Sequence, residues 1–217
     1  MKLLLRSTAL LAVAAGVLGN PAGAAAAPAE PHEGAHASGH GHPQPVRQAA
    51  VRREAVEFFW YDCYHSAELE QPLTGWAAKH HDDVALRRVP AVWPGSGDEQ
   101  VQTAHARLYY TLERLGEADR LQQSVYRAVR EQHADLTTED RAADWAVRHG
   151  LSAAAFRAAY RSAEVERATA EAPELFTRYR ITELPTVIVD GRYRTSPTEA
   201  GGVEQMPSAL DRVLDTR

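Results

Sequence analysis

The change of hydrophobic period along the chain limits its fold more than any other feature of the sequence. Apolar runs of strand length occur near both ends of the folded part, and helical spacing fills the middle. The predicted elements, in order, are a strand over 55–61, a helix over 66–79, a strand over 84–93, helices within 98–163, a helix over 165–179, strands at 187–189 and 192–195, and a helix over 206–214. The Asp190-Gly191 pair between the last two strands is a strong hairpin signal. The order predicts an α/β fold interrupted by a helical insertion.

Several positions inside these elements have specific predicted roles. Thr137, with Asp140 three residues later, and Ser152 have the pattern of helix N-terminal caps. Trp60 is expected to point into the packing of the sheet. The large aromatic side chains expected in the core are Trp76, Trp93, Trp145, Phe156 and Tyr160.

The first 27 residues have the pattern of a secretory signal peptide. Lys2 and Arg6 precede an apolar stretch over 9–18, and small residues follow up to Ala27. The apolar stretch is too short to span a bilayer. We therefore predict cleavage within 24–27 and a periplasmic or secreted protein; an uncleaved N-terminal anchor is the alternative.

Residues 28–45 are rich in Ala, Pro, Gly and His and have almost no large apolar side chain, which predicts a disordered linker. The tract contains His32, His36, His40 and His42, so weak binding of a divalent metal is an alternative role. No cysteine or acidic cluster completes a ligand set there, and we predict neither a resident metal nor another cofactor. The formal net charge of −5 makes nucleic acid an improbable partner.

Cys63, the one cysteine in the chain, directly follows the first predicted strand and precedes a helix. The N–H groups and the dipole at a helix start stabilise a thiolate, and His65 adds a hydrogen bond or a positive charge. Asp62 opposes them, because a carboxylate next to a thiol disfavours its ionisation. The sequence does not decide between these effects, although helix geometry and His65 together favour a reactive thiol over an inert one.

Two segments together resemble the DsbA family of thiol–disulfide oxidoreductases. The run 56–70 (VEFFWYDCYHSAELE) is similar to the family's active-site segment, in which a strand ending in Glu-Phe-Phe leads to Cys-Pro-His-Cys at a helix start. Leu184-Pro185-Thr186, followed by a strand and a hairpin, resembles the family's cis-proline loop. The resemblance covers 46–214 and implies a thioredoxin-like fold with an inserted helical domain.

The resemblance also implies a division of the chain. The predicted parts are a signal peptide (1–27), a linker (28–45), a first thioredoxin-like part (46–97), a helical insertion (98–163) and a second thioredoxin-like part (164–217).

The chain departs from the family at the active site. Tyr64 replaces the proline and Ser66 replaces the second, resolving cysteine. Without that cysteine the protein stores no internal disulfide, so a mixed disulfide at Cys63 persists until an external thiol attacks it. This favours monothiol exchange, isomerisation or substrate trapping over dithiol oxidation. The Ser66 hydroxyl and His65 remain candidates for tuning the thiol.

The resemblance implies roles for further residues. Leu184 and Pro185 would pair with an extended peptide through their backbone, and Tyr64 would line the same groove. A partly buried charged set would lie near the thiol and set its protonation; its members would be Glu57, Glu70 and Arg88. A surface location of these three charges is the alternative.

Three functions compete at this stage. The first is an exported thiol:disulfide interchange protein acting on protein thiols and disulfides, with glutathione or a membrane redox partner as a further reactant. The second is a redox-inactive module that binds peptides or a partner protein in the groove. The third, a metal-handling protein using the histidine tract with Cys63 and His65, is ranked last, because a flexible linker separates the two parts.

Overall fold

A computed structural model of the chain describes residues 52–216. The predicted signal peptide (1–27) and the predicted linker (28–45) lie outside the described residues. No helix within 52–216 is long and apolar enough to cross a membrane.

The centre of the fold is a four-stranded sheet with the order β2-β1-β3-β4. Its strands are β1 (Arg53–Phe59), β2 (Val84–Pro90), β3 (Thr186–Val189) and β4 (Tyr193–Thr195). The first two strands are parallel, and β3 runs antiparallel to both β1 and β4. Because β1 and β2 are joined by a helix, and β3 and β4 by the Asp190-Gly191 turn with φ of 52° and 66°, the sequence signals for both connections are confirmed.

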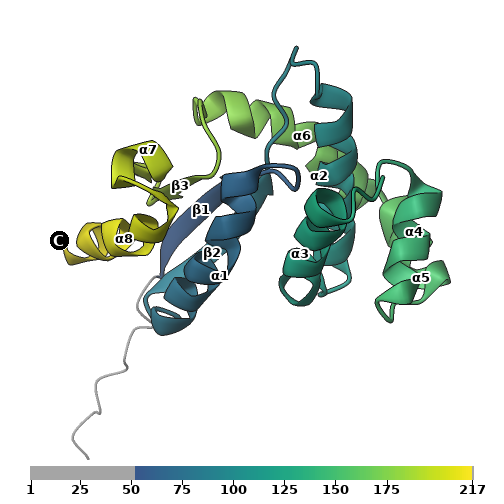
Figure 1. The fold of residues 1–217 in the computed structure, drawn as a ribbon, viewed down its shortest axis with the longest axis horizontal. Helices are drawn as coiled ribbons and strands as arrows, with labels where there is room; N and C mark the ends of the chain where they lie inside the picture. Colours follow the sequence, from purple (N-terminus) through teal and green to yellow (C-terminus); the bar gives the residue numbers. More distant parts are fainter. Residues whose placement is uncertain (1–51, 217) are drawn as a thin grey trace, which may run out of the picture. The chain divides into compact units, whose positions relative to one another are not determined.

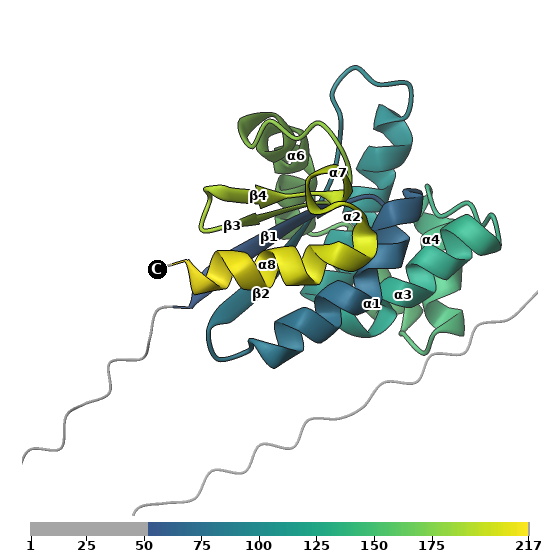
Figure 2. The same cartoon turned by 60° about the vertical axis from the view of Figure 1, so that its left-hand side comes forward.

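Helices cover both faces of the sheet. Figure 2 shows α6 (Ala163–Arg178) on one side and α1 (Tyr64–Lys79) with α8 (Met206–Asp215) on the other. The side chains alternate accordingly: Ala55 packs with α1 and α8, whereas Val56 packs with Phe176 of α6. Two short helices, α7 (Pro197–Ala200) and the 3₁₀ turn η2 (Val203–Gln205), precede α8.

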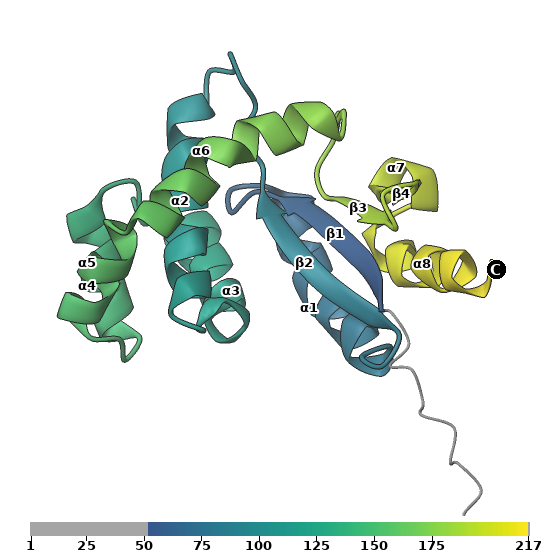
Figure 3. The ribbon, with the colours of Figure 1, turned by 180° about the vertical axis from the view of Figure 1, so that it is seen from behind.

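The remaining helices form a block between β2 and α6 in sequence (Figures 1 and 3). They are α2 (Glu99–Arg114), α3 (Ala118–Tyr126), the π-helical turn η1 (Arg127–Glu131), α4 (Glu139–Arg148) and α5 (Ala153–Tyr160). Their buried side chains form one apolar cluster that also includes Phe59 and Tyr61, at and just beyond the end of β1. The block therefore packs directly on the segment that leads to Cys63.

The predicted α/β, thioredoxin-like fold with inserted helices is confirmed, and three local predictions are corrected. β1 ends at Phe59 rather than 61, and β2 ends at Pro90 rather than 93. Thr138, not Thr137, caps α4, because the N–H and hydroxyl of Thr137 are bonded to Asp135 Oδ1 at 3.0 and 2.5 Å. The division into domains stays a prediction.

Two aromatic predictions were wrong. Trp93 is 47% exposed, since it follows β2 on the surface, where its ring contacts that of Phe176. Trp60 does not point into the sheet, because the strand has already ended and its indole turns towards α2. The other predicted core aromatics are buried: Trp76, Trp145, Phe156 and Tyr160.

Candidate functional site

Cys63 lies at the N-terminus of α1, at the end of a tight turn that leaves β1. Its backbone N–H donates to Trp60 O at 3.0 Å, and its carbonyl accepts from Ala67 N at 3.1 Å. Cys63 is the N-cap residue, and its side chain makes no capping hydrogen bond. The first-turn N–H groups of a helix carry partial positive charge, so they stabilise negative charge that develops on the sulphur.

The cysteine faces the loop before β3. The thiol of Cys63, which is partly exposed, donates to Leu184 O at 3.6 Å. The Leu184–Pro185 peptide bond is cis, and β3 begins at the next residue, Thr186. The fold thus brings together two predicted site residues that are far apart in sequence.

The three residues after Cys63 have different environments. Tyr64 is 57% exposed and His65 is also exposed, with their ring centroids 5.6 Å apart. Ser66 is fully buried, and its hydroxyl accepts a hydrogen bond of 3.4 Å from Trp60 N. Ser66 therefore helps to close the turn around Cys63, and it supplies no second sulphur.

A groove of about 680 Å³ opens next to this turn, between α1 and the α7–η2 segment. The residues that line it include His65, Gln71, Pro72, Val203 and Gln205. Its wall mixes polar and apolar groups. Of the predicted site residues, His65 lines this groove, whereas Tyr64, Leu184 and Pro185 do not.

The three predicted charged residues meet inside the protein. Glu57 on β1 and Arg88 on β2 are register partners, and Arg88 Nε lies 3.2 Å from Glu57 Oε2 in an ion pair that is not aligned as a hydrogen bond. Arg88 Nη2 donates to Glu70 Oε1 on α1 at 2.9 Å. All three are at most 8% exposed, so they are not surface charges.

One buried guanidinium thus faces two buried carboxyl groups. Burial raises the pKa of Glu57 to about 8; the guanidinium of Arg88 acts against this rise, and Glu70 adds to it. Burial also raises the pKa of Glu70, against the effect of Arg88. Burial disfavours the charged form of Arg88, but the two carboxylates outweigh it and raise its pKa. The Glu57 carboxyl therefore keeps its proton to a higher pH than a carboxyl in the unfolded chain.

This proton makes the stability depend on pH. The folded protein keeps the Glu57 proton up to about pH 8, whereas the unfolded chain loses it near 4.5, so the group's contribution is complete at low pH and is lost as the pH rises through 8. We expect Glu57→Gln to flatten the fall in unfolding free energy between about pH 5 and 8, where this group contributes a slope of up to about 1.4 kcal/mol per pH unit. Urea unfolding at several pH values gives the slope of unfolding free energy against pH for the unmodified protein and for Glu57→Gln. Equal slopes in the two proteins would refute the raised pKa of Glu57.

Two residues of the turn are held by side chains that the sequence analysis did not single out. Trp60 Nε1 donates to His105 Nδ1 on α2 at 3.1 Å, and Tyr61 OH donates to Gln122 Oε1 on α3 at 2.8 Å. Burial lowers the pKa of His105 to about 4, so its ring is neutral and accepts this bond. Helical spacing with Leu108 and Leu112 places His105 on the inward side of its helix, and this signal could have identified it.

Among residues 52–216 no hydrogen bond or ion pair joins the Glu57–Arg88–Glu70 set to Cys63. In the same part of the chain, no group of three or more His, Cys, Asp or Glu side chains is placed to hold a metal ion. Cys63 itself presents a single thiol at a helix start beside a backbone carbonyl.

Comparison with known proteins agrees with this geometry. The family model of the DSBA-like thioredoxin domain matches residues 66–211. The chain belongs to the DsbA family. The match begins at Ser66, the position that the sequence analysis assigned to the missing resolving cysteine.

Individual DsbA proteins are similar over most of the chain. The thiol:disulfide interchange protein DsbA of Burkholderia cepacia is 32% identical over 89% of this chain and 90% of its own length, and that of Azotobacter vinelandii is 32% identical over 79% and 77%. The crystal structure of Pseudomonas aeruginosa DsbA covers 82% of this chain and 92% of its own, with a TM-score of 0.68 and 29% identity. The family relationship supports an oxidoreductase role for this DsbA-family protein.

Proposed function

We propose that this DsbA-family protein is an exported, periplasmic thiol:disulfide interchange protein that acts through Cys63 alone. The observation that carries the proposal is the site itself: a partly exposed cysteine at a helix start, with a buried serine where a second thiol would have to lie. The N-terminal sequence pattern supports export.

The reaction consists of two exchanges. The Cys63 thiolate attacks one sulphur of a substrate disulfide, forms a mixed disulfide and releases the other sulphur as a thiolate, which takes up a proton. A second thiol of the same substrate then attacks the mixed disulfide, forms a new substrate disulfide and releases Cys63. The sum is isomerisation, with no net oxidation. If a small thiol such as glutathione attacks the Cys63 sulphur instead, the substrate leaves as a dithiol and Cys63 carries the glutathione. A second glutathione then releases Cys63 and forms glutathione disulfide, so two small thiols are oxidised for each substrate disulfide reduced.

The other site residues have roles that follow from their positions. Leu184 O accepts from the thiol, and we assign Leu184 and Pro185 to the backbone that receives the substrate chain. The exposed Tyr64 is assigned to contact with the same chain, and His65 to the wall of the groove. Ser66 keeps the turn closed through Trp60 N. The buried Glu57–Arg88–Glu70 set is assigned to proton control.

The mixed disulfide is the species to detect. Mixing the protein with a disulfide-scrambled ribonuclease and quenching with acid should give a covalent adduct through Cys63, seen on non-reducing gels and located by mass spectrometry. This protein has no second thiol to resolve the adduct, so the adduct should persist until a substrate thiol attacks it or the acid quench traps it, and it should disappear on addition of glutathione. Cys63→Ala should form none, whereas Ser66→Ala should still form it. Absence of any adduct at Cys63 in the unmodified protein would refute the proposal.

The groove favours one second candidate, a peptide-binding module in which Cys63 has no role. Its 680 Å³ lies beside the turn and does not include the sulphur among its lining atoms. If Cys63→Ala binds an unfolded, disulfide-free chain as tightly as the unmodified protein, and the unmodified protein forms no adduct, this second function replaces the first.

A further inference from the structure

Arg130 contacts both neighbours of Cys63 from the helical block. Its Nη1 donates to the carboxylate of Asp62 at 3.1 Å and also to the backbone carbonyl of Asp62. Its guanidinium lies over the ring of Tyr64, 5.5 Å from the centroid. One side chain therefore holds the residue before the nucleophile and the residue after it.

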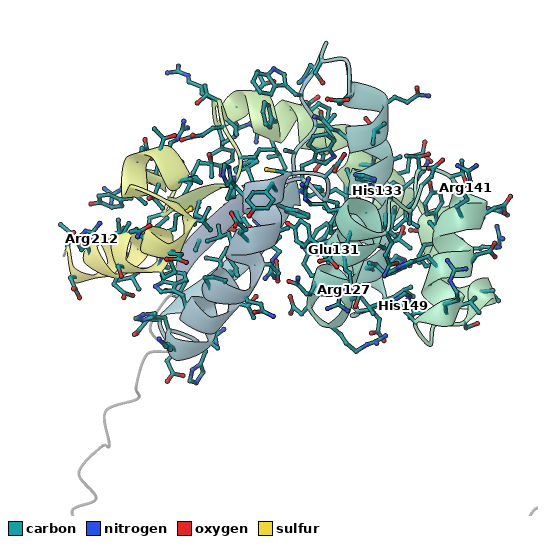
Figure 4. The ribbon with its side chains drawn as sticks, viewed as in Figure 1. Arg127, Glu131, His133, Arg141, His149 and Arg212 are labelled. Atoms are coloured by element: carbon teal, nitrogen blue, oxygen red, sulfur yellow. The ribbon has the colours of Figure 1, made fainter. Side chains whose placement is uncertain are left out.

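The backbone that carries Arg130 is unusual. It belongs to η1, a single π-helical turn over Arg127–Glu131 whose two end residues are labelled in Figure 4. Turns of this kind are rare and are often found at functional sites. The side chain of Arg130 is 28% exposed, whereas Arg127 of the same turn is 55% exposed and contacts Glu131 at 4.0 Å.

The contact bears directly on the charge balance at Cys63. A carboxylate next to the sulphur opposes the negative charge that develops when the thiol reacts, and the N-terminus of α1 favours it. A guanidinium bound to that carboxylate removes most of the opposition. It also fixes the carbonyl of Asp62, and so the backbone that leads to Cys63.

We propose that Arg130 is a positioning residue for Cys63, which offsets the charge of Asp62 and fixes the turn on both sides of the sulphur. The proposal rests on the proposed function only in its biological purpose, because the reactivity of the thiol is measurable without a protein substrate. An ordinary exposed ion pair would contribute little. This pair differs from such a pair because it has a backbone contact, an aromatic contact and the nucleophile as its neighbour.

Alkylation of Cys63 by iodoacetamide, followed across pH, tests the charge effect. We expect Arg130→Gln to slow the reaction at pH 7 about fivefold, which corresponds to about 1 kcal/mol, and to move the midpoint of the pH–rate profile upward. Arg130→Lys should keep most of the rate, because it keeps the charge. Arg127→Gln, the matched change in the same turn, should leave the profile unchanged.

A second change separates charge from mere structure. Asp62→Asn in the Arg130→Gln background should restore the midpoint, because the opposing carboxylate is gone. An unchanged profile in Arg130→Gln, or a loss that Asp62→Asn does not restore, would overturn the proposal. The two proposals can fail separately. If the alkylation rates change as expected in these variants, but the unmodified protein forms no mixed disulfide with ribonuclease, the proposed function is refuted and the role of Arg130 stands.

Discussion

Ser66→Cys is expected to turn the protein into a dithiol oxidase. The variant would have two thiols at the start of α1, in the spacing that the family uses, with Cys63 partly exposed and position 66 buried. Once oxidised, it can pass its disulfide to a reduced dithiol peptide and become a dithiol itself. We expect a burst of one peptide disulfide per protein molecule, where the unmodified protein gives none.

The measurement is direct. The variant is oxidised with glutathione disulfide, separated from the small molecule and from any protein that carries glutathione, and mixed with a peptide that contains two cysteines. The peptide disulfide is followed by mass spectrometry. Cys63→Ala in the Ser66→Cys background and Ser66→Ala are the controls, and both should give no burst. If the variant forms its internal disulfide and still leaves the peptide reduced, the site lacks the geometry of an oxidoreductase.

One structural consequence accompanies this gain. The Ser66 hydroxyl accepts from Trp60 N, and sulphur is a weaker acceptor, so the reduced variant loses part of the bond that closes the turn. Ser66→Ala loses the same bond without gaining a thiol. Comparing the unfolding free energies of these two variants therefore separates the cost of the lost bond from the effect of the new disulfide.

The fold could be predicted because its signals are local. The apolar run that becomes β1, the Asp190-Gly191 turn and the helical spacing of α2 each reflect the period of one element. The errors lie where an element ends. Trp60 follows a strand that stops one residue earlier, and the turn then directs its indole to α2.

The site could be predicted only in part, because most of its contacts join distant segments. The cysteine and the loop at Leu184 were found through motifs, although their 3.6 Å contact is tertiary. Arg130 lies in no recognisable sequence motif. It is a polar residue in a π-helical turn, and the hydrophobic spacing of the sequence does not indicate such a turn. The same holds for Gln122, a buried polar residue on α3 whose Oε1 accepts a hydrogen bond from Tyr61 OH.

Arg88→Met is expected to destabilise the protein strongly. The change removes the one guanidinium that faces the buried carboxyl groups of Glu57 and Glu70. Removing one partner of a buried ion pair leaves an uncompensated charge and typically costs about 3–5 kcal/mol of unfolding free energy. Urea unfolding at pH 7 measures the loss. Arg87→Met is the matched control, since Arg87 on the same strand forms an exposed pair with Glu54 at 2.8 Å and should cost less than about 1 kcal/mol.

The loss of unfolding free energy in Arg88→Met should depend on pH. Protonation neutralises both carboxyl groups, and burial already raises the pKa of each. The loss caused by Arg88→Met should therefore be smaller at pH 5 than at pH 8, because the neutral groups need no countercharge.

A combined variant separates charge from packing. Glu57→Gln and Glu70→Gln together in the Arg88→Met background should recover much of the stability at pH 8, since no unpaired charge then remains buried. A loss that is equal at both pH values and is not recovered in this variant would mean that the aliphatic packing of Arg88, rather than its charge, holds β1, β2 and α1 together.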